Sequence, residues 1–273
     1  MIYLDGRWVE DRGATISVMD LAVLRGFGIF DFLRTYGVRP FRLEDHIERF
    51  FNSARHMGMK PVYSEEEMVA ITKEGIERCG FENTNIKMIQ TGGISADGFT
   101  PAAKQTFFMY FYEAHEYPAE MYEKGVALKT SRLMRQVPLA KTINYGASIT
   151  EVMKAQQTGF VDILHTDHGG NIYEGTRSNF FAVKKRTLIT AEKGILEGIT
   201  RKVILEIAKE ESIPVEYRFV TKDELSKIDE AFTTNSSQEI VPVVKINDMR
   251  IGDGNVGDVT MKLMKKFKEK VKK

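Results

Sequence analysis

The chain has 273 residues, of which 42% are hydrophobic, and its formal net charge is +1. This length and composition suit one large domain or two of ordinary size, and the balanced charge gives no reason to expect nucleic acid or a membrane as partner. Cys79 is the only cysteine, which excludes an internal disulfide and a cysteine-based metal cluster. Because no apolar run approaches the roughly 18 residues of a membrane span and the N-terminus lacks a signal-peptide layout, we expect a cytoplasmic protein.

The first third of the chain is predicted to contain a hairpin, two helices and further strands. Asp5-Gly6 stands between apolar and aromatic residues, a pattern that indicates a β-hairpin with a two-residue turn. Apolar residues spaced three and four apart predict a helix over 44–57. Ser64 and Glu67 have the spacing of a capping box, which predicts a second helix to about Cys79. Further strands are expected at 85–90 and 105–113, on either side of a loop at 91–104.

A polar segment without periodicity at 114–125, which contains Pro118, is the expected connection between two domains. We therefore expect a first domain over 1–113 and a second over 126–273. The elements expected in the second domain are strands at 126–132, 180–183, 231–234 and 240–246, helices at 149–158, 200–211 and from about 259, and a hairpin turn at 167–171.

Two residues of the second domain indicate chemistry. Lys141 follows Pro138 and precedes a tract of small and polar residues, typical of a loop that runs into a helix and can present an amine to a cavity. Glu174 stands in a turn-rich segment between the expected hairpin and an apolar strand. A pyridine aldehyde cofactor needs these two groups, because the amine forms a Schiff base and the carboxylate keeps the ring nitrogen protonated.

Three motifs in this order resemble a known family. They are Pro-Leu-Ala-Lys141-Thr-Ile-Asn-Tyr, Glu174-Gly-Thr-Arg-Ser-Asn-Phe-Phe and Leu196-Glu-Gly-Ile-Thr-Arg. Together they resemble the class IV (fold type IV) pyridoxal-phosphate enzymes, namely branched-chain aminotransferases, D-amino-acid aminotransferases and aminodeoxychorismate lyases. The resemblance covers nearly the whole chain. It implies an α+β protein with a small α/β N-terminal domain and a larger pseudo-barrel C-terminal domain that binds pyridoxal 5′-phosphate.

The resemblance also assigns residues to the cofactor phosphate. Ile199 and Thr200 follow Gly198 at the start of an expected helix, where free backbone N–H groups can face an anion, and the family uses this loop in the same way. Arg49 matches the family's phosphate arginine, although alone it would indicate only a surface helix arginine. Asn235 and Ser236 are expected to close the phosphate site from the other side.

The resemblance assigns further residues to the cofactor ring. Leu196 corresponds to the apolar residue that packs against one face of the ring, and Tyr145 to a tyrosine that bonds the phenolic oxygen in several relatives. Glu174 is then the partner of the ring nitrogen. Lys141 is the catalytic residue, which holds the cofactor and moves the Cα proton of the amino acid before a keto acid is released. The reverse half-reaction then consumes a second 2-keto acid.

The amino donor is less clear from the sequence. Phe30 resembles the branched-chain enzymes, whereas Asn144 has the spacing of the D-amino-acid group. Arg25 and Arg177 are expected to border the pocket and to bind a substrate carboxylate, with a structural ion pair as the equal alternative. Because an unpaired buried arginine is costly, we favour D-amino acids, with branched-chain L-amino acids and then an aminodeoxychorismate lyase as alternatives.

The remaining predictions concern partners. Ser237 is expected to reach either the phosphate or the substrate. His165 and His168 have no third ligand nearby, so we expect no metal site. Members of the family complete their active site, which lies between the two domains, with a loop from a second subunit. We therefore expect a homodimer in which Arg25 is contributed across subunits, with small amino and keto acids as substrates and neither nucleic acid nor membrane as partner.

Overall fold

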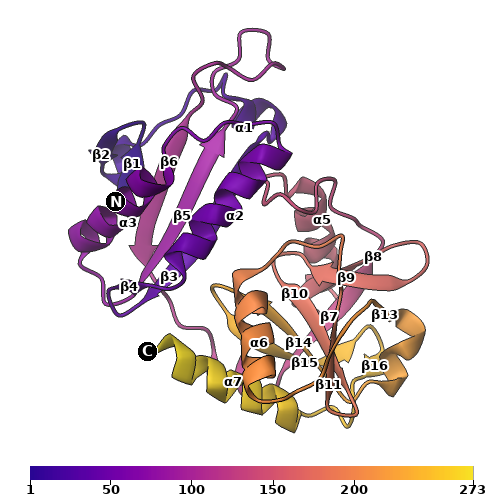
Figure 1. Ribbon diagram of the computed structural model, residues 1–273. Helices are drawn as coiled ribbons and strands as arrows, with labels where there is room; N and C mark the ends of the chain where they lie inside the picture. Colours follow the sequence, from indigo (N-terminus) through magenta and orange to yellow (C-terminus); the bar gives the residue numbers. More distant parts are fainter. Residues whose placement is uncertain (273) are drawn as a thin grey trace. The chain divides into compact units, whose positions relative to one another are not determined.

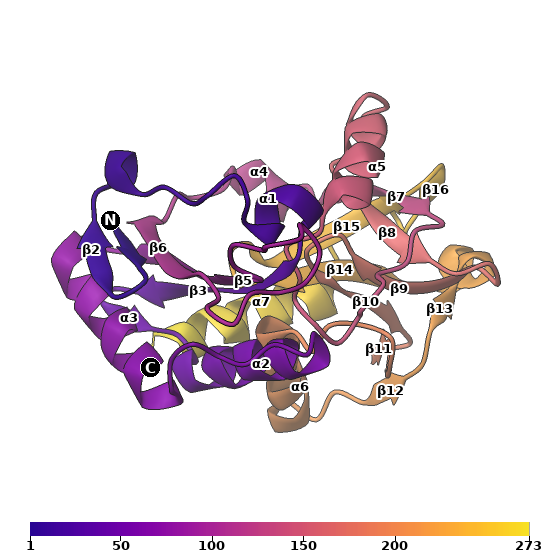
Figure 2. The same cartoon turned by 90° about the horizontal axis from the view of Figure 1, so that it is seen from above.

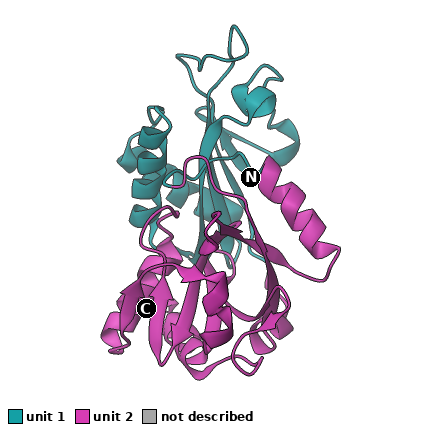
Figure 3. Ribbon diagram, turned by 90° about the vertical axis from the view of Figure 1, so that its right-hand side faces the viewer, with its two compact units in different colours: residues 1–115, 139–145 teal, residues 116–138, 146–273 magenta. Residues whose placement is uncertain are grey.

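The computed structural model describes residues 1–272, which form two compact units (Figure 1 and Figure 3). Unit 1 consists of residues 1–115 together with 139–145, so it contains Lys141. Unit 2 consists of residues 116–138 and the chain from 146 onward. The domain boundaries expected from the sequence stay a prediction. Across residues 1–272, no helix is both long enough and apolar enough to cross a membrane.

Unit 1 contains a six-stranded sheet with the order β2-β1-β6-β5-β3-β4, in which every neighbouring pair is antiparallel. Its strands are β1 (Ile2–Leu4), β2 (Arg7–Val9), β3 (Gly28–Tyr36), β4 (Arg39–Pro40), β5 (Thr84–Thr91) and β6 (Phe107–Glu113). Asp5 and Gly6 join β1 to β2 with φ angles of 44° and 91°. These left-handed conformations are the ones that a two-residue hairpin turn requires, and the predicted hairpin is confirmed.

Two helices cover one face of this sheet, α2 (Leu43–His56) and α3 (Glu65–Cys79), as Figures 1 and 2 show. Both were predicted. The capping box of α3 is also confirmed, because Ser64 Oγ accepts from Glu67 N at 3.2 Å and the Glu67 carboxylate accepts from Ser64 N at 2.7 Å. The core between sheet and helices includes Ile29, Leu33, Ile47, Phe50, Met88 and Met109.

Alternation along β3 decides which of its side chains meet the helices. Ile29 and Leu33 belong to the core, so Asp31 between them also points towards α2, and Phe30 points to the opposite face of the sheet. The helix α1 (Leu21–Arg25) and the short η1 (Asp11–Gly13) were not predicted. They are too short to show a helical period in the sequence.

Unit 2 consists of many short elements. They are α4 (Ala119–Glu123), β7 (Val126–Ser131), α5 (Gly146–Gln156), β8 (Asp162–Thr166), β9 (Asn171–Gly175), β10 (Asn179–Lys184), β11 (Thr187–Thr190), α6 (Ile199–Glu210), β12 (Val215–Tyr217), β13 (Val220–Thr221), η2 (Lys222–Lys227), β14 (Glu230–Asn235), β15 (Glu239–Ile246), β16 (Met249–Arg250) and α7 (Asp258–Val271). The expected helices and the hairpin β8-β9 are confirmed, with α5 beginning at Gly146 rather than 149. The short strands β11, β12, β13 and β16 were missed, because so few residues show no alternation.

The sheet of unit 2 closes on itself. Its strands follow the order β10-β14-β15-β7-β8-β9, and β9 also pairs with β10. The residues that close the ring are Glu174 in β9 and Asn179 in β10. The expected pseudo-barrel and the α+β class are therefore confirmed, and Glu174 lies at the strand pair that completes the ring.

Candidate active site

Lys141 is fixed through its backbone. Its carbonyl accepts from Phe30 N in β3 at 2.8 Å, and its N–H donates to Ser53 Oγ in α2 at 3.0 Å. Two residues on, Ile143 N donates to Gly28 O at 3.1 Å. A Cβ at Gly28 would lie 2.7 Å from the Gln90 carbonyl oxygen and 2.9 Å from Ile143 Cδ1, so glycine allows both neighbours to approach closely. The 139–145 segment therefore lies along β3 with its conformation held at several points.

The side chain of Lys141 lies against an aromatic pair. Its Nζ is 4.7 Å from the centroid of the Phe30 ring, and the Tyr145 ring is 6.0 Å from the same centroid. Lys141 and Phe30 are each only 9% exposed. The structure thus brings three predicted site residues together in unit 1, with the amine over the Phe30 ring.

Arg49 is also buried in unit 1, where its partners are residues that the sequence does not predict. Its Nε and Nη2 each donate to the Asp31 carboxylate at 2.8 Å, and His46 Nδ1 lies 2.7 Å from the same carboxylate. Burial alone would raise the pKa of Asp31, but the charges and hydrogen bonds of Arg49 and His46 outweigh it and hold the pKa well below its usual range. Burial also lowers the pKa of His46. The carboxylate therefore fixes the orientation of the guanidinium group.

Glu174 is the centre of the candidate site in unit 2. It is 3% exposed, and its Oε2 accepts from Leu196 N at 3.1 Å. The Arg135 guanidinium lies 3.5 Å from Oε1, and Asn179 Nδ2 lies 3.4 Å from Oε2. Neither Arg135 nor the Asn179 side chain was assigned a role from the sequence, although both stand within or close to the motifs. The structure thus places two of the predicted residues, Glu174 and Leu196, in direct contact.

The loop after Leu196 leads into α6 with an open helix start. Gly198 is the N-cap residue, and the cap makes no side-chain hydrogen bond. Ile199 and Thr200 form the first turn and are 6% and 4% exposed. The first N–H groups of a helix have no acceptor within it, and the helix dipole adds positive potential there. These groups and the Thr200 hydroxyl fit a phosphate dianion.

Asn235, Ser236 and Ser237 form the turn after β14. The Asn235 side-chain oxygen accepts from Ser237 N at 3.0 Å and from Gln238 N at 2.7 Å, so this side chain stabilises the turn itself. Ser237 Oγ lies 2.9 Å from the Tyr117 hydroxyl. Within residues 1–272, the buried Thr234 hydroxyl has no hydrogen-bond partner, a situation that buried polar groups usually avoid unless a bound molecule supplies one.

Arg25 and Arg177 are both exposed. Arg25 ends α1 and donates to the Leu24 carbonyl at 2.9 Å, and Arg177 lies in the turn between β9 and β10. The charge of Arg177 acts on Asp162, whose pKa burial raises. We favoured D-amino acids because an arginine buried without a partner is costly. Both arginines are exposed in the single chain, so this argument does not apply to it.

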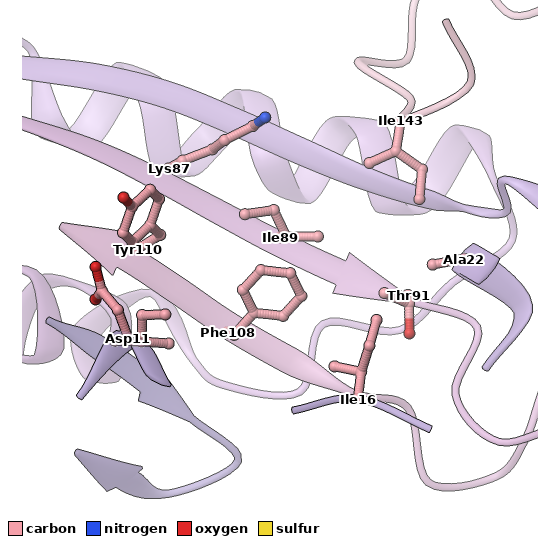
Figure 4. Close-up of a pocket in the computed structure, with 10 residues that line it drawn as sticks. Asp11, Ile16, Ala22, Lys87, Ile89, Thr91, Phe108, Tyr110 and Ile143 are labelled. Atoms are coloured by element: carbon pink, nitrogen blue, oxygen red, sulfur yellow. The ribbon is translucent and has the colours of Figure 1, made fainter. Parts of the chain in front are cut away.

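A cavity of about 480 Å³ lies on the face of the unit 1 sheet opposite to α2 and α3 (Figure 4). Its walls are mainly apolar, and they include Ile16, Ile89, Phe108, Tyr110 and Ile143. Phe30 pairs directly with Ile89 across β3 and β5, so it faces the same side. Lys141 does not line this cavity, and most of the residues that do are hydrophobic.

Comparison with known proteins gives one consistent result. The family model described as amino-transferase class IV matches residues 28–246. A Methanocaldococcus jannaschii protein with the provisional name of branched-chain-amino-acid aminotransferase is 33% identical over 98% of this chain and 95% of its own length. A D-alanine aminotransferase of Staphylococcus haemolyticus is 29% identical over 97% of this chain and 96% of its own. The crystal structure of the T.th. branched-chain amino acid aminotransferase with pyridoxamine 5′-phosphate superposes with a TM-score of 0.92, at 31% identity and over 99% and 93% of the two chains.

Proposed function

The chain belongs to the class IV aminotransferase family, and from that premise we propose that it binds pyridoxal 5′-phosphate and uses Lys141 to exchange an amino group between an amino acid and a 2-keto acid. Enzymes of this family are pyridoxal-phosphate enzymes. The observation that carries the proposal is a pair of buried groups, the Lys141 amine on a fixed segment and the Glu174 carboxylate held by Leu196 N. Both stand in motifs that the sequence shares with the family.

The described residues divide the chemistry between them. When bound, the cofactor supplies an aldehyde carbon that takes up an amine and a ring that accepts electrons once its nitrogen is protonated. Glu174 holds a proton at that nitrogen. Lys141 Nζ anchors the cofactor and later moves the Cα proton of the amino acid. Leu196 packs against the ring, and Tyr145 orients it.

The phosphate has its own set of residues. The N–H groups of Ile199 and Thr200 bind it at the start of α6, and the oriented guanidinium of Arg49 balances its charge. Asn235 and Ser236 complete this set. The unpartnered hydroxyl of Thr234, next to Asn235, supports the fit of a polar ligand at this end of β14.

Reduction with borohydride tests the cofactor proposal. Purified protein should be yellow, and borohydride should bleach the visible band and fix the cofactor covalently to the peptide that contains Lys141. Lys141→Ala should abolish this adduct. Lys87→Ala is the matched control, because Lys87 Nζ also lies over the Phe30 ring, at 4.9 Å. An adduct that persists in Lys141→Ala, or one found on Lys87, would overturn the assignment.

Two classes of amino donor are each supported by an observation. The Phe30 ring beside the Lys141 amine suits an aliphatic side chain, as in a branched-chain L-amino acid. The guanidinium groups of Arg25 and Arg177 suit the carboxylate of D-alanine or D-glutamate. Because both arginines are exposed, the cost of burying them no longer separates the two classes.

A half-reaction screen separates the donors. The absorption of the bound cofactor is followed with each enantiomer of alanine, glutamate and leucine. If Arg177 binds a substrate carboxylate, Arg177→Ala should slow D-alanine and D-glutamate by roughly a hundredfold or more. Fast conversion of L-leucine without response to any D-amino acid identifies a branched-chain enzyme. Pyruvate release from aminodeoxychorismate would identify the lyase.

Assembly into a homodimer, with Arg25 contributed to the neighbouring subunit, is the last part of the proposal. Large apolar side chains are exposed around α1 and the 91–104 loop, and these are Ile16, Val18, Met19, Val23, Ile94 and Phe99. Phe99 is 77% exposed. Exposed apolar groups of this size, next to the open apolar cavity of unit 1, are typical of a surface that a partner covers.

A further inference from the structure

We propose that Asn179 is a positioning residue that couples Glu174, the proposed partner of the ring nitrogen, to the loop that binds the cofactor phosphate. Position 198 is then glycine because Asn179 occupies the space that a side chain at this position would need. This inference rests on the proposed function for its catalytic consequence. The coupling itself is a property of unit 2 and can be measured without cofactor.

The backbone of Asn179 joins two cofactor segments. Asn179 is the first residue of β10, where it pairs with Glu174 in β9 and with Thr234 in β14. Asn235 and Ser236, the next residues of the proposed phosphate site, follow Thr234 directly. Any displacement of Asn179 would therefore move both segments.

The side chain of Asn179 joins a third segment. Its Nδ2 donates to Leu196 O at 2.8 Å and to Glu174 Oε2 at the longer distance of 3.4 Å. Leu196 N donates to the same Glu174 oxygen at 3.1 Å, so the three residues form a closed circuit. A carbonyl can only accept, which fixes the amide with Nδ2 towards Leu196. Asn179 is 3% exposed, so water cannot readily replace these bonds.

The side-chain oxygen of Asn179 explains why position 198 is glycine. An ideal Cβ built on Gly198 would collide with Asn179 Oδ1, far inside a van der Waals contact. The φ angle of Gly198 is −69°, which any residue can adopt, so the constraint is packing and not backbone conformation. Asn179 thus contacts both Leu196 and the N-cap residue of α6, and it sets the distance between the Glu174 carboxylate and the helix start.

Two substitutions separate the parts of this coupling. Asn179→Ala leaves Leu196 O without its donor and opens space above Gly198. Asn179→Asp keeps the shape, but it removes the N–H donors and places a second carboxylate beside Glu174, where like charges make the pair retain a proton. In that variant Glu174 is no longer an independent carboxylate that can hold the ring nitrogen protonated.

Hydrogen exchange of the cofactor-free protein is the first experiment. Asn179→Ala should raise the exchange rate of the 195–200 peptide at least about tenfold, because a buried hydrogen bond and its packing are lost. Thr166→Val is the matched control, since it removes the hydrogen bond from the buried Thr166 hydroxyl to Ser131 O elsewhere in unit 2. Unchanged exchange in Asn179→Ala, or an equal increase in the control, would overturn the coupling.

A double-mutant cycle on cofactor affinity is the second experiment. Gly198→Ala alone should weaken binding of pyridoxal 5′-phosphate by about a hundredfold or more, since the new methyl group collides with Asn179 Oδ1. In the Asn179→Ala background the same change should cost far less, because the space is open. Equal losses in both backgrounds would refute the packing role.

The pH profile is the third experiment. Asn179→Asp should shift the pH dependence of the cofactor absorption band, and Thr166→Val should not. A wild-type profile in Asn179→Asp would refute the positioning role. Failure of the wild type to bind pyridoxal 5′-phosphate would refute the proposed function instead, and the exchange experiment would still decide the coupling.

Discussion

Asp31 and Glu174 are both buried carboxylates, yet their surroundings suit them to different tasks. Asp31 receives three contacts of 2.7–2.8 Å from Arg49 and His46, which occupy both of its oxygens. The contacts of Glu174 with Leu196, Asn179 and Arg135 are longer, at 3.1, 3.4 and 3.5 Å. A carboxylate saturated by short charged bonds is a structural anchor, whereas one in looser contacts can exchange a partner for a ligand. Asp31 therefore positions Arg49, and the longer contacts of Glu174 support its proposed role as the partner of the ring nitrogen.

Replacing Glu174 by glutamine tests this difference. Glu174→Gln keeps the size of the side chain and can still accept from Leu196 N, so the cofactor should remain bound. Turnover should fall to a small fraction of wild type, since an amide cannot hold the ring nitrogen protonated. Cofactor content by absorption and steady-state rates measure the two effects. Near-wild-type turnover would contradict the role of Glu174.

The burial of His165 predicts a pH-dependent stability for unit 2. It is 2% exposed, and within residues 1–272 neither ring nitrogen has a hydrogen-bond partner. Burial, with a smaller contribution from the charge of Arg135, lowers its pKa to about 4. Between pH 6.5 and 4 the unfolded chain therefore binds a proton that the folded chain does not. The free energy of unfolding must fall as the pH is lowered through this range.

The prediction is that lowering the pH from 7 to 5 costs the wild type about 2 kcal/mol more of unfolding free energy than it costs His165→Leu. Urea unfolding of the cofactor-free protein at both pH values measures this difference. His168→Leu is the control, because His168 is exposed on the adjoining turn and should behave like wild type. Parallel pH dependence in His165→Leu and wild type would contradict a buried neutral His165.

At the scale of elements, the pair of β3 and α2 positions the proposed cofactor residues of unit 1. Strand β3 carries Phe30 on one face and Asp31 on the other, and α2 contributes Arg49 and Ser53. Lys141 bonds to both elements through its backbone. A disturbance of the Asp31–Arg49 pair should therefore affect the stability of the unit as well as cofactor binding.

Arg49→Met should lower the unfolding free energy of the cofactor-free protein by about 3–5 kcal/mol at pH 7, because it leaves Asp31 buried without its guanidinium partner. Asp31→Asn in the same background should recover part of this loss. Because the pKa of Asp31 is lowered by folding, the difference between wild type and Arg49→Met should shrink as the pH falls below roughly 4. Denaturant unfolding across this pH range measures both effects. An unfolding free energy that is unchanged in Arg49→Met would show that the Asp31–Arg49 pair contributes little to stability.

Most long elements could be predicted from the sequence, and the short ones could not. The helices α2, α3, α6 and α7 show apolar periodicity over eleven or more residues or a capping box, so their signals are strong. By contrast, α1 depends on one side-chain cap at Asp20 and a left-handed Gly26, and it is only five residues long. Such local features do not stand out without the surrounding structure.

At the scale of the whole chain, the same distinction applies to the site. Lys141, Glu174 and Leu196 stand in contiguous motifs, so the sequence alone could propose them as site residues. The partners of these residues come from distant positions, such as Asp31 for Arg49 or Asn179 for Leu196. The sequence records which side chains are present, but it does not show which of them folding will bring within about 3 Å. That is why the sequence does not predict Asp31 as the partner of Arg49.

The last prediction concerns assembly. If a second copy covers the exposed apolar groups around α1 and the 91–104 loop, the protein should sediment as a dimer at micromolar concentration. Phe99→Asp should weaken it, because a charge cannot be buried at an apolar contact without a large cost. Val38→Asp is the matched control, since Val38 is 74% exposed on the β3–β4 turn, away from these groups.

Arg25→Ala should keep the dimer but slow turnover, if Arg25 serves the neighbouring subunit. Mixing Arg25→Ala chains, which are slow, with Lys141→Ala chains, which are inactive, should then restore activity in the mixed dimer, whose one competent site combines an intact Lys141 with an intact Arg25. An active monomer in sedimentation would rule out both the dimer and the cross-subunit role of Arg25.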